Sequence, residues 1–71
     1  MNNQAMPEGD ARVYARNIAK MIEGLIVELR GDMEEIDDLQ AKALFEVSAE
    51  VLGGLQKAFN DYENRSEEAW K

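Results

Sequence analysis

The sequence predicts an all-α protein built as an antiparallel helical hairpin of two amphipathic helices. Apolar residues recur at three- and four-residue spacing through two long segments, which places them on one face of a helix. The only proline, Pro7, precedes both segments, so no ring interrupts either helix. A short Gly31-Asp32 pair separates the segments, and so short a connection makes the helices antiparallel neighbours.

The first helix is expected over residues 10–30, after a polar N-terminal arm at residues 1–9. Its apolar positions follow a helical period, and they are Ala11, Tyr14, Ala15, Ile18, Met21, Ile22, Leu25 and Leu29. Gly31 is expected to end this helix in the left-handed conformation, because glycine adopts it without steric cost. Arg30 in the last turn suits the negative end of the helix dipole.

The second helix is expected over residues 33–62, after a turn at residues 31–32. Asp32 is the expected N-cap, with Glu35 in the position of a capping box. The main apolar stripe consists of Met33, Ile36, Leu44, Val47, Val51, Leu55, Ala58 and Tyr62. Gly53 and Gly54 mark either a kink, a break or a close approach of another helix. Residues 63–71 form a polar tail or a frayed helix end.

These boundaries make the second helix about 45 Å long and the first about 30 Å. The apolar residues beyond Gly53 and Gly54 therefore extend past the start of the first helix, and they include Leu55, Phe59 and Tyr62. The N-terminal arm, a third helix after the glycines, or a second copy of the chain would cover them. We expect the second copy, in a homodimer that forms a four-helix bundle.

A second apolar row supports self-association, because Phe45, Leu52 and Phe59 are spaced by seven residues. The alternative is that this row widens the core of the hairpin. Val13 and Val27 lie opposite the main stripe, where they either face a partner or are ordinary surface residues. The candidate interaction residues, for self-association or for a partner, are Tyr14, Val13, Val27, Phe45, Leu52, Leu55, Phe59, Tyr62 and Trp70.

Composition narrows the possible functions. The chain has no Cys and no His, which removes thiolate chemistry and the commonest general base and metal ligand. It has 15 acidic and 8 basic residues, and a net charge of -7 opposes binding to nucleic acid or anionic lipid. With no apolar run of about 20 residues and no signal-peptide pattern, the sequence predicts a cytoplasmic, non-enzymatic protein without a cofactor.

The densest group of charges is an acidic rim formed by Glu34, Glu35, Asp37 and Asp38. Acids near a helix N-terminus complement its dipole and add solubility. The run also resembles the Glu-Glu-x-x-Glu motif of all-α nucleotide pyrophosphatases, a resemblance that implies a magnesium site. The chain departs from that motif, since Asp38 replaces the last Glu and Glu46 and Glu50 are spaced by four residues.

The sequence thus favours a small acidic module that acts stoichiometrically by occupying an apolar groove, with a basic rim, on a host regulatory protein or enzyme. It is similar in general character to inhibitors and adaptors encoded by phages and other mobile elements. The alternatives are a phosphate-mimicking inhibitor of a nucleic-acid-binding protein, a structural subunit or secretion chaperone, and the magnesium-dependent pyrophosphatase.

Overall fold

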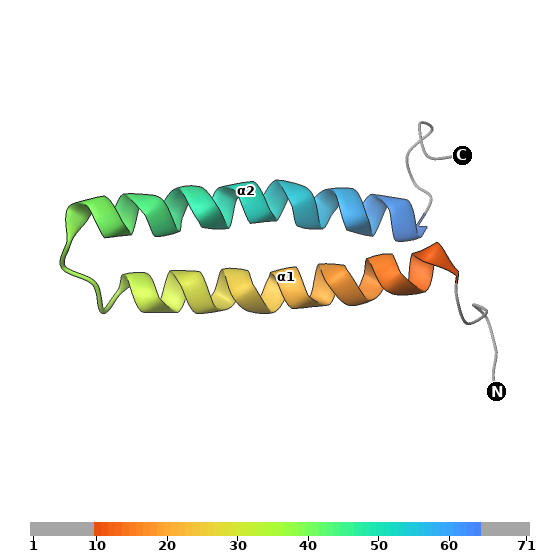
Figure 1. Ribbon diagram of the computed structural model, residues 1–71, viewed down its shortest axis with the longest axis horizontal. Helices are drawn as coiled ribbons and strands as arrows, with labels where there is room; N and C mark the ends of the chain where they lie inside the picture. The colour runs from red at the N-terminus through yellow and green to blue at the C-terminus, as the bar shows by residue number, and fades with distance from the viewer. Residues whose placement is uncertain (1–9, 65–71) are drawn as a thin grey trace.

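Two antiparallel helices make up the part of the chain, residues 10–64, that the computed structural model describes (Figure 1). Helix α1 spans Ala11–Met33 and helix α2 spans Leu39–Asn64, and no strand occurs between residues 10 and 64. The start of α1 and the end of α2 lie side by side, at the end of the hairpin opposite the turn. The predicted all-α helical hairpin is therefore confirmed. Neither helix is long and apolar enough to cross a membrane.

Helix α1 begins at an aspartate cap. Asp10 has extended backbone angles, and its carboxylate Oδ1 accepts a hydrogen bond of 2.8 Å from the backbone N–H of Arg12. The guanidinium Nη2 of Arg12 donates to Oδ2 of the same carboxylate, also at 2.8 Å. This hydrogen bond and the charge of Asp10 raise the pKa of Arg12. The cap satisfies a backbone donor that no intrahelical acceptor reaches.

The turn lies further along the chain than expected. Helix α1 continues through Gly31 and Asp32 to Met33, so the expectation of a glycine-capped end at Arg30 is wrong. Gly31 keeps a helical backbone, and its carbonyl accepts a hydrogen bond of 3.2 Å from the N–H of Glu34. A left-handed cap is unnecessary there, because hydrogen bonds between residues three apart, as in a 3₁₀-helix, satisfy the last carbonyls of α1.

Asp38, and not Asp32, caps the second helix. Its Oδ1 accepts hydrogen bonds from the backbone N–H groups of Gln40 and Ala41, at 2.8 and 3.2 Å. The expected turn at residues 31–32 is thus replaced by a turn at residues 34–38. The acidic rim lies in this turn instead of in the first turn of a helix.

The shifted turn makes the helices nearly equal in length. Helix α1 has 23 residues and α2 has 26, which correspond to about 34 and 39 Å. The expected overhang is therefore wrong, because Phe59 and Tyr62 lie beside Ala11 and Tyr14 of α1. Helix α2 also runs through Gly53 and Gly54 without a break.

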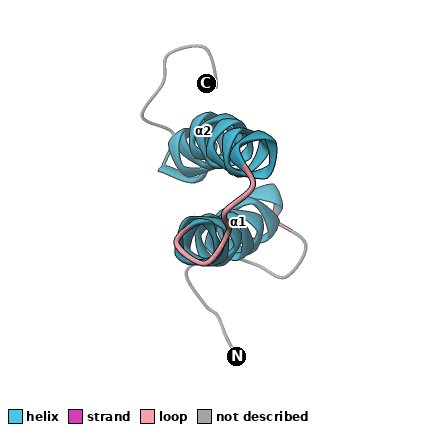
Figure 2. Ribbon diagram, turned by 90° about the vertical axis from the view of Figure 1, so that its left-hand side faces the viewer, coloured by secondary structure: helices cyan, strands magenta, loops and turns pink. Residues whose placement is uncertain are grey.

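Few side chains are fully buried between the helices. Among the described residues, the buried set consists of Ala15, Ala19, Ile22 and Ala49. Viewed end-on, the two helices form a single layer that is one helix thick (Figure 2). Within residues 10–64, no further element lies above or below this layer to cover the remaining apolar positions.

We predict that Asp38→Ala lowers the free energy of unfolding by about 1 kcal/mol, because two backbone N–H groups lose their acceptor. Urea unfolding measures this loss. Asp32→Ala is the matched control, and it changes stability by less than about 0.5 kcal/mol because it lies within the last turn of α1. If Asp32→Ala instead lowered the stability more than Asp38→Ala, the cap of the second helix would lie at Asp32.

Gly53→Ala is predicted to raise the free energy of unfolding by about 0.5–1 kcal/mol. The glycine lies inside a continuous helix, and a Cβ at this position meets nothing within 4 Å. Alanine therefore gains helix propensity without a steric cost. Thermal unfolding followed by circular dichroism measures the change, and a lower melting temperature would show a close approach that the hairpin alone does not contain.

Candidate protein-interaction surface

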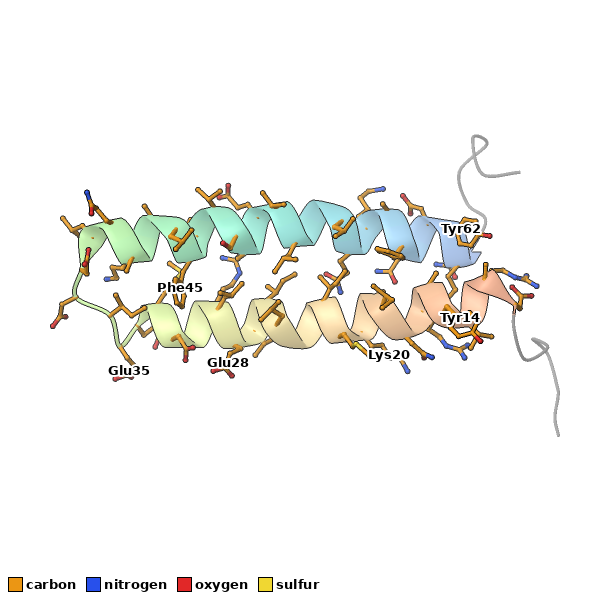
Figure 3. All side chains as sticks on the ribbon, in the orientation of Figure 1. Tyr14, Lys20, Glu28, Glu35, Phe45 and Tyr62 are labelled. Atoms are coloured by element: carbon orange, nitrogen blue, oxygen red, sulfur yellow. The ribbon has the colours of Figure 1, made fainter. Side chains whose placement is uncertain are left out.

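The row of α2 that faces α1 is the second apolar row, whose residues are spaced by seven. Phe45, Leu52 and Phe59 are half-buried on either side of Ala49, which is 1% exposed. Figure 3 shows Phe45 between the two helices. This row therefore contributes to the core of the hairpin, as one of the two interpretations of the sequence held.

The main stripe of α2 is exposed. Leu44, Val47, Val51 and Leu55 retain between 46% and 64% of their accessible surface. The main stripe identified in the sequence is therefore not the row of α2 that packs against α1. The two rows lie about 100° apart on one helix, and packing the row with two phenylalanines against α1 removes more apolar surface from water.

Helix α1 carries a matching exposed row. Tyr14, Ile18, Met21 and Leu25 are between 38% and 69% exposed. At 100° per residue, this row lies about 100° from the buried Ala15, Ala19 and Ile22, and the exposed row of α2 is displaced from its own contact row by a similar angle. Because the helices are antiparallel and the displacements have the same sense, both rows lie on the same side of the hairpin.

Two grooves between the helices confirm that the rows share one side. The first has a volume of about 340 Å³ at the open end, where Tyr14 and Ile18 approach Ala58 and Tyr62. The second has a volume of about 430 Å³, and its lining includes Leu25 and Val51. We name this side the apolar face, and it comprises Tyr14, Ile18, Met21, Leu25, Leu44, Val47, Val51, Leu55, Ala58 and Tyr62.

The opposite side of the hairpin is polar. Gln56 Nε2 donates to Glu23 Oε1 at 2.6 Å, and two longer ion pairs flank this bond. Arg16 Nη1 lies 3.9 Å from Glu63 Oε2, and Arg30 Nη1 lies 3.7 Å from Glu46 Oε1. We name these three pairs the polar edge. Such exposed pairs contribute little to the stability of the fold individually, but their charged and polar groups keep this side of the layer in contact with water.

Charge is distributed unevenly along the hairpin. From residue 32 to residue 38 the chain carries five acids and no base, and Glu34, Glu35, Asp37 and Asp38 are exposed. Figure 3 shows Glu35 at this turn, pointing away from both helices. At the open end, Asp10, Asp61 and Glu63 are matched by Arg12, Arg16 and Lys57. The turn end is therefore strongly negative, whereas the described part of the open end is neutral.

The acidic rim lacks the helical geometry that the pyrophosphatase resemblance implies. Glu34 and Glu35 lie in the turn, Asp38 Oδ1 is engaged as a cap, and Glu46 pairs with Arg30. Among residues 10–64, no three carboxylates converge to hold a metal ion. The rim is thus a dispersed acidic surface in this part of the chain.

The other predicted interaction residues are spread over the molecule. Leu55 and Tyr62 belong with Tyr14 to the apolar face. Val27 is 62% exposed on the outer side of α1, and Val13 is half-buried on the same side of that helix. Trp70 lies outside the described residues.

Most of the apolar face was missed by reasoning from the sequence. Ile18, Met21, Val47 and Val51 belong to the apolar stripes identified in the sequence, but they were not among the predicted interaction residues, and they are exposed. The signal was the second apolar row of α2, because one hairpin contact buries only one row on each helix. The sequence does not determine which of the two apolar rows of α2 faces away from α1.

Comparisons of the chain with family models, with curated proteins and with solved structures find no match in any of the three.

We predict that Phe45→Ala lowers the free energy of unfolding by about 2 kcal/mol. Substituting a fully buried phenylalanine by alanine typically costs about 3–5 kcal/mol of stability, and a half-buried one costs roughly half of that. Urea unfolding is the measurement, and Val27→Ala on the outer side of α1 is the control, with a change within about 0.5 kcal/mol. Equal effects of the two substitutions would contradict the assignment of Phe45 to the contact between the helices.

Proposed function

We propose that this chain is a non-enzymatic protein-interaction module that assembles through its apolar face, most simply as a two-fold homodimer, and that acts stoichiometrically on a partner protein. One observation carries the proposal. An apolar face spanning both helices is exposed on a hairpin whose described buried core is only three alanines and one isoleucine. A face of this kind is typical of an interaction surface.

The size of the face supports assembly with a second copy. A layer about 34 Å long and two helix diameters, or about 20 Å, wide offers roughly 700 Å² for each copy. Two copies then bury about 1,400 Å² in total, which lies in the range of stable interfaces. The product is a four-helix bundle, in which each apolar row is enclosed by neighbours.

The composition of the face also supports its burial. From Tyr14 to Leu29 of α1 and from Leu44 to Tyr62 of α2, no Asp, Glu, Lys or Arg falls in the arcs that contain these rows. Asp32 lies on the same row of α1, but beyond Leu29, at the exposed turn end. Burying these arcs therefore desolvates no charge, and the gain from apolar burial is not offset by that cost. The Tyr14 and Tyr62 hydroxyls lie at the open end, next to solvent.

The partner of the dimer is proposed to be a protein with an apolar groove bordered by basic residues. The net charge of -7 and the exposed acidic rim favour encounter with a basic surface. Among the described residues, Val27 and the half-buried Val13 on α1 lie outside the apolar face, and we propose that they contribute to the contact with this partner. An inhibitor or adaptor of the phage or mobile-element type, acting in the cytoplasm, fits this arrangement.

A second candidate function, a phosphate-mimicking inhibitor, is favoured by the grouping of exposed acids at residues 32–38. Salt distinguishes it from groove binding, because raising the ionic strength from about 0.1 to 0.5 M screens charge-based affinity. Groove binding then keeps its equilibrium affinity within about tenfold, whereas a phosphate mimic loses two or more decades. A structural subunit or secretion chaperone would share the bundle but act without inhibiting an enzyme or regulator.

The assembly is tested by a matched pair of substitutions. Val51 and Val27 are 64% and 62% exposed in the hairpin, but only Val51 lies on the apolar face. Val51→Asp is expected to weaken self-association by at least tenfold, because a carboxylate would be buried without a partner, and Val27→Asp is expected to leave it unchanged. Sedimentation equilibrium measures both.

A wild-type mass near 8.0 kDa at micromolar concentration would overturn the proposed assembly. Equal effects of the two aspartates would also contradict it, because the apolar face would then have no special role.

A further inference from the structure

We infer that the two copies pair with their acidic turns at opposite ends of the bundle, α1 against α1 and α2 against α2. This inference rests on the proposed assembly through the apolar face. Two hairpins that share such a face have only two two-fold arrangements. An axis parallel to the helices puts both turns at one end and packs α1 on the α2 of the second copy. An axis across the helices puts the turns at opposite ends.

Charge separates the two arrangements. Residues 32–38 carry five acids and no base, so turns at the same end gather ten carboxylates from two copies. Packed helices lie 8–10 Å apart, which is about one Debye length at 0.1 M salt, so this repulsion is only partly screened. Turns at opposite ends place each acidic turn beside an open end whose described charges are balanced. The arrangement with turns at opposite ends therefore avoids the repulsion between the two acidic turns.

The register of the hairpin is compatible with an axis across the helices. The exposed row of α2 runs from Leu44 to Ala58, and its midpoint is Val51. The residue of α1 beside Val51 is Leu25, since both line the second groove. An axis across the helices at Val51 thus passes next to Leu25, which also belongs to the apolar face.

Side-chain sizes match along α2 in this arrangement. Leu44 of each copy meets Ala58 of the other, a large residue against a small one, and Val47 meets Leu55. Val51 meets its own symmetry mate at the axis. Alternation of large and small side chains across facing positions fills such a contact without voids.

A spin-label distance measures the orientation directly, because the chain has no cysteine and one substitution gives a unique label. Glu35→Cys places the label on the exposed turn, where Glu35 contributes a backbone hydrogen bond of 2.9 Å to the carbonyl of Asp32 that the substitution retains. Turns at opposite ends give a distance of about 35 Å or more between the labels of two copies, since each helix is about 34–39 Å long. Turns at the same end give less than about 25 Å.

A disulfide gives an independent readout. Val51→Cys is expected to form a covalent dimer on mild oxidation, because the two sulfurs meet at the axis, within the short Cα separation that a disulfide requires. In the same-end arrangement the two Val51 positions lie on diagonally opposite helices and stay unlinked. Val27→Cys, equally exposed on the outer side of α1, is the control for random collision.

The outcomes separate the orientation from the assembly. A long Glu35→Cys distance together with a Val51→Cys dimer supports the inference. A dimer whose main distance is below about 25 Å overturns the orientation and leaves the proposed assembly intact. The absence of any distance between copies, with a mass near 8.0 kDa, overturns the assembly and the inference with it.

Discussion

The most deeply buried part of the contact between the helices is made mainly of small residues, and this constraint determines the rest of the structure. Three alanines and Ile22 are the buried residues of the described chain, so the helices meet along a narrow seam. Phe45, Leu52 and Phe59 fill the flanks of that seam, and the second row of each helix remains outside. A seam of this width cannot enclose two apolar rows on each helix. The surplus apolar surface is therefore a direct result of how the hairpin closes.

The two helices, their antiparallel order and the approximate start of α1 were predictable from the sequence, because apolar periodicity and the position of Pro7 are local signals. The Asp10 cap itself was found only in the structure. The turn was not predictable from local signals. Asp32 and Asp38 are both good caps, and the choice depends on the pairing of the helices over their whole length. The inner row of α2 was ambiguous for a similar reason, since periodicity identifies apolar rows but not which of them meets α1.

The separation of charged and apolar surfaces connects the fold to the proposed function. The acids are concentrated in the turn, the apolar residues lie on one side of the layer, and the polar edge occupies the other side. The net charge thus varies along the length of the hairpin, whereas the exposed apolar surface varies from one side of it to the other. A protein with this division presents different chemistry at its end and on its flank, although its fold has only two helices.

Because Asp10 and Asn64 lie at the same end of the hairpin, a pulling force applied through the two ends acts on the helix contact like a zipper. The polar edge would open in order, from Arg16 and Glu63 through Glu23 and Gln56 to Arg30 and Glu46 near the turn. Each step breaks one short stretch of contact, so the resisting force is small, in contrast to a shear that would load the whole seam at once. The hairpin therefore has low mechanical strength along this direction, whatever its stability to urea or heat.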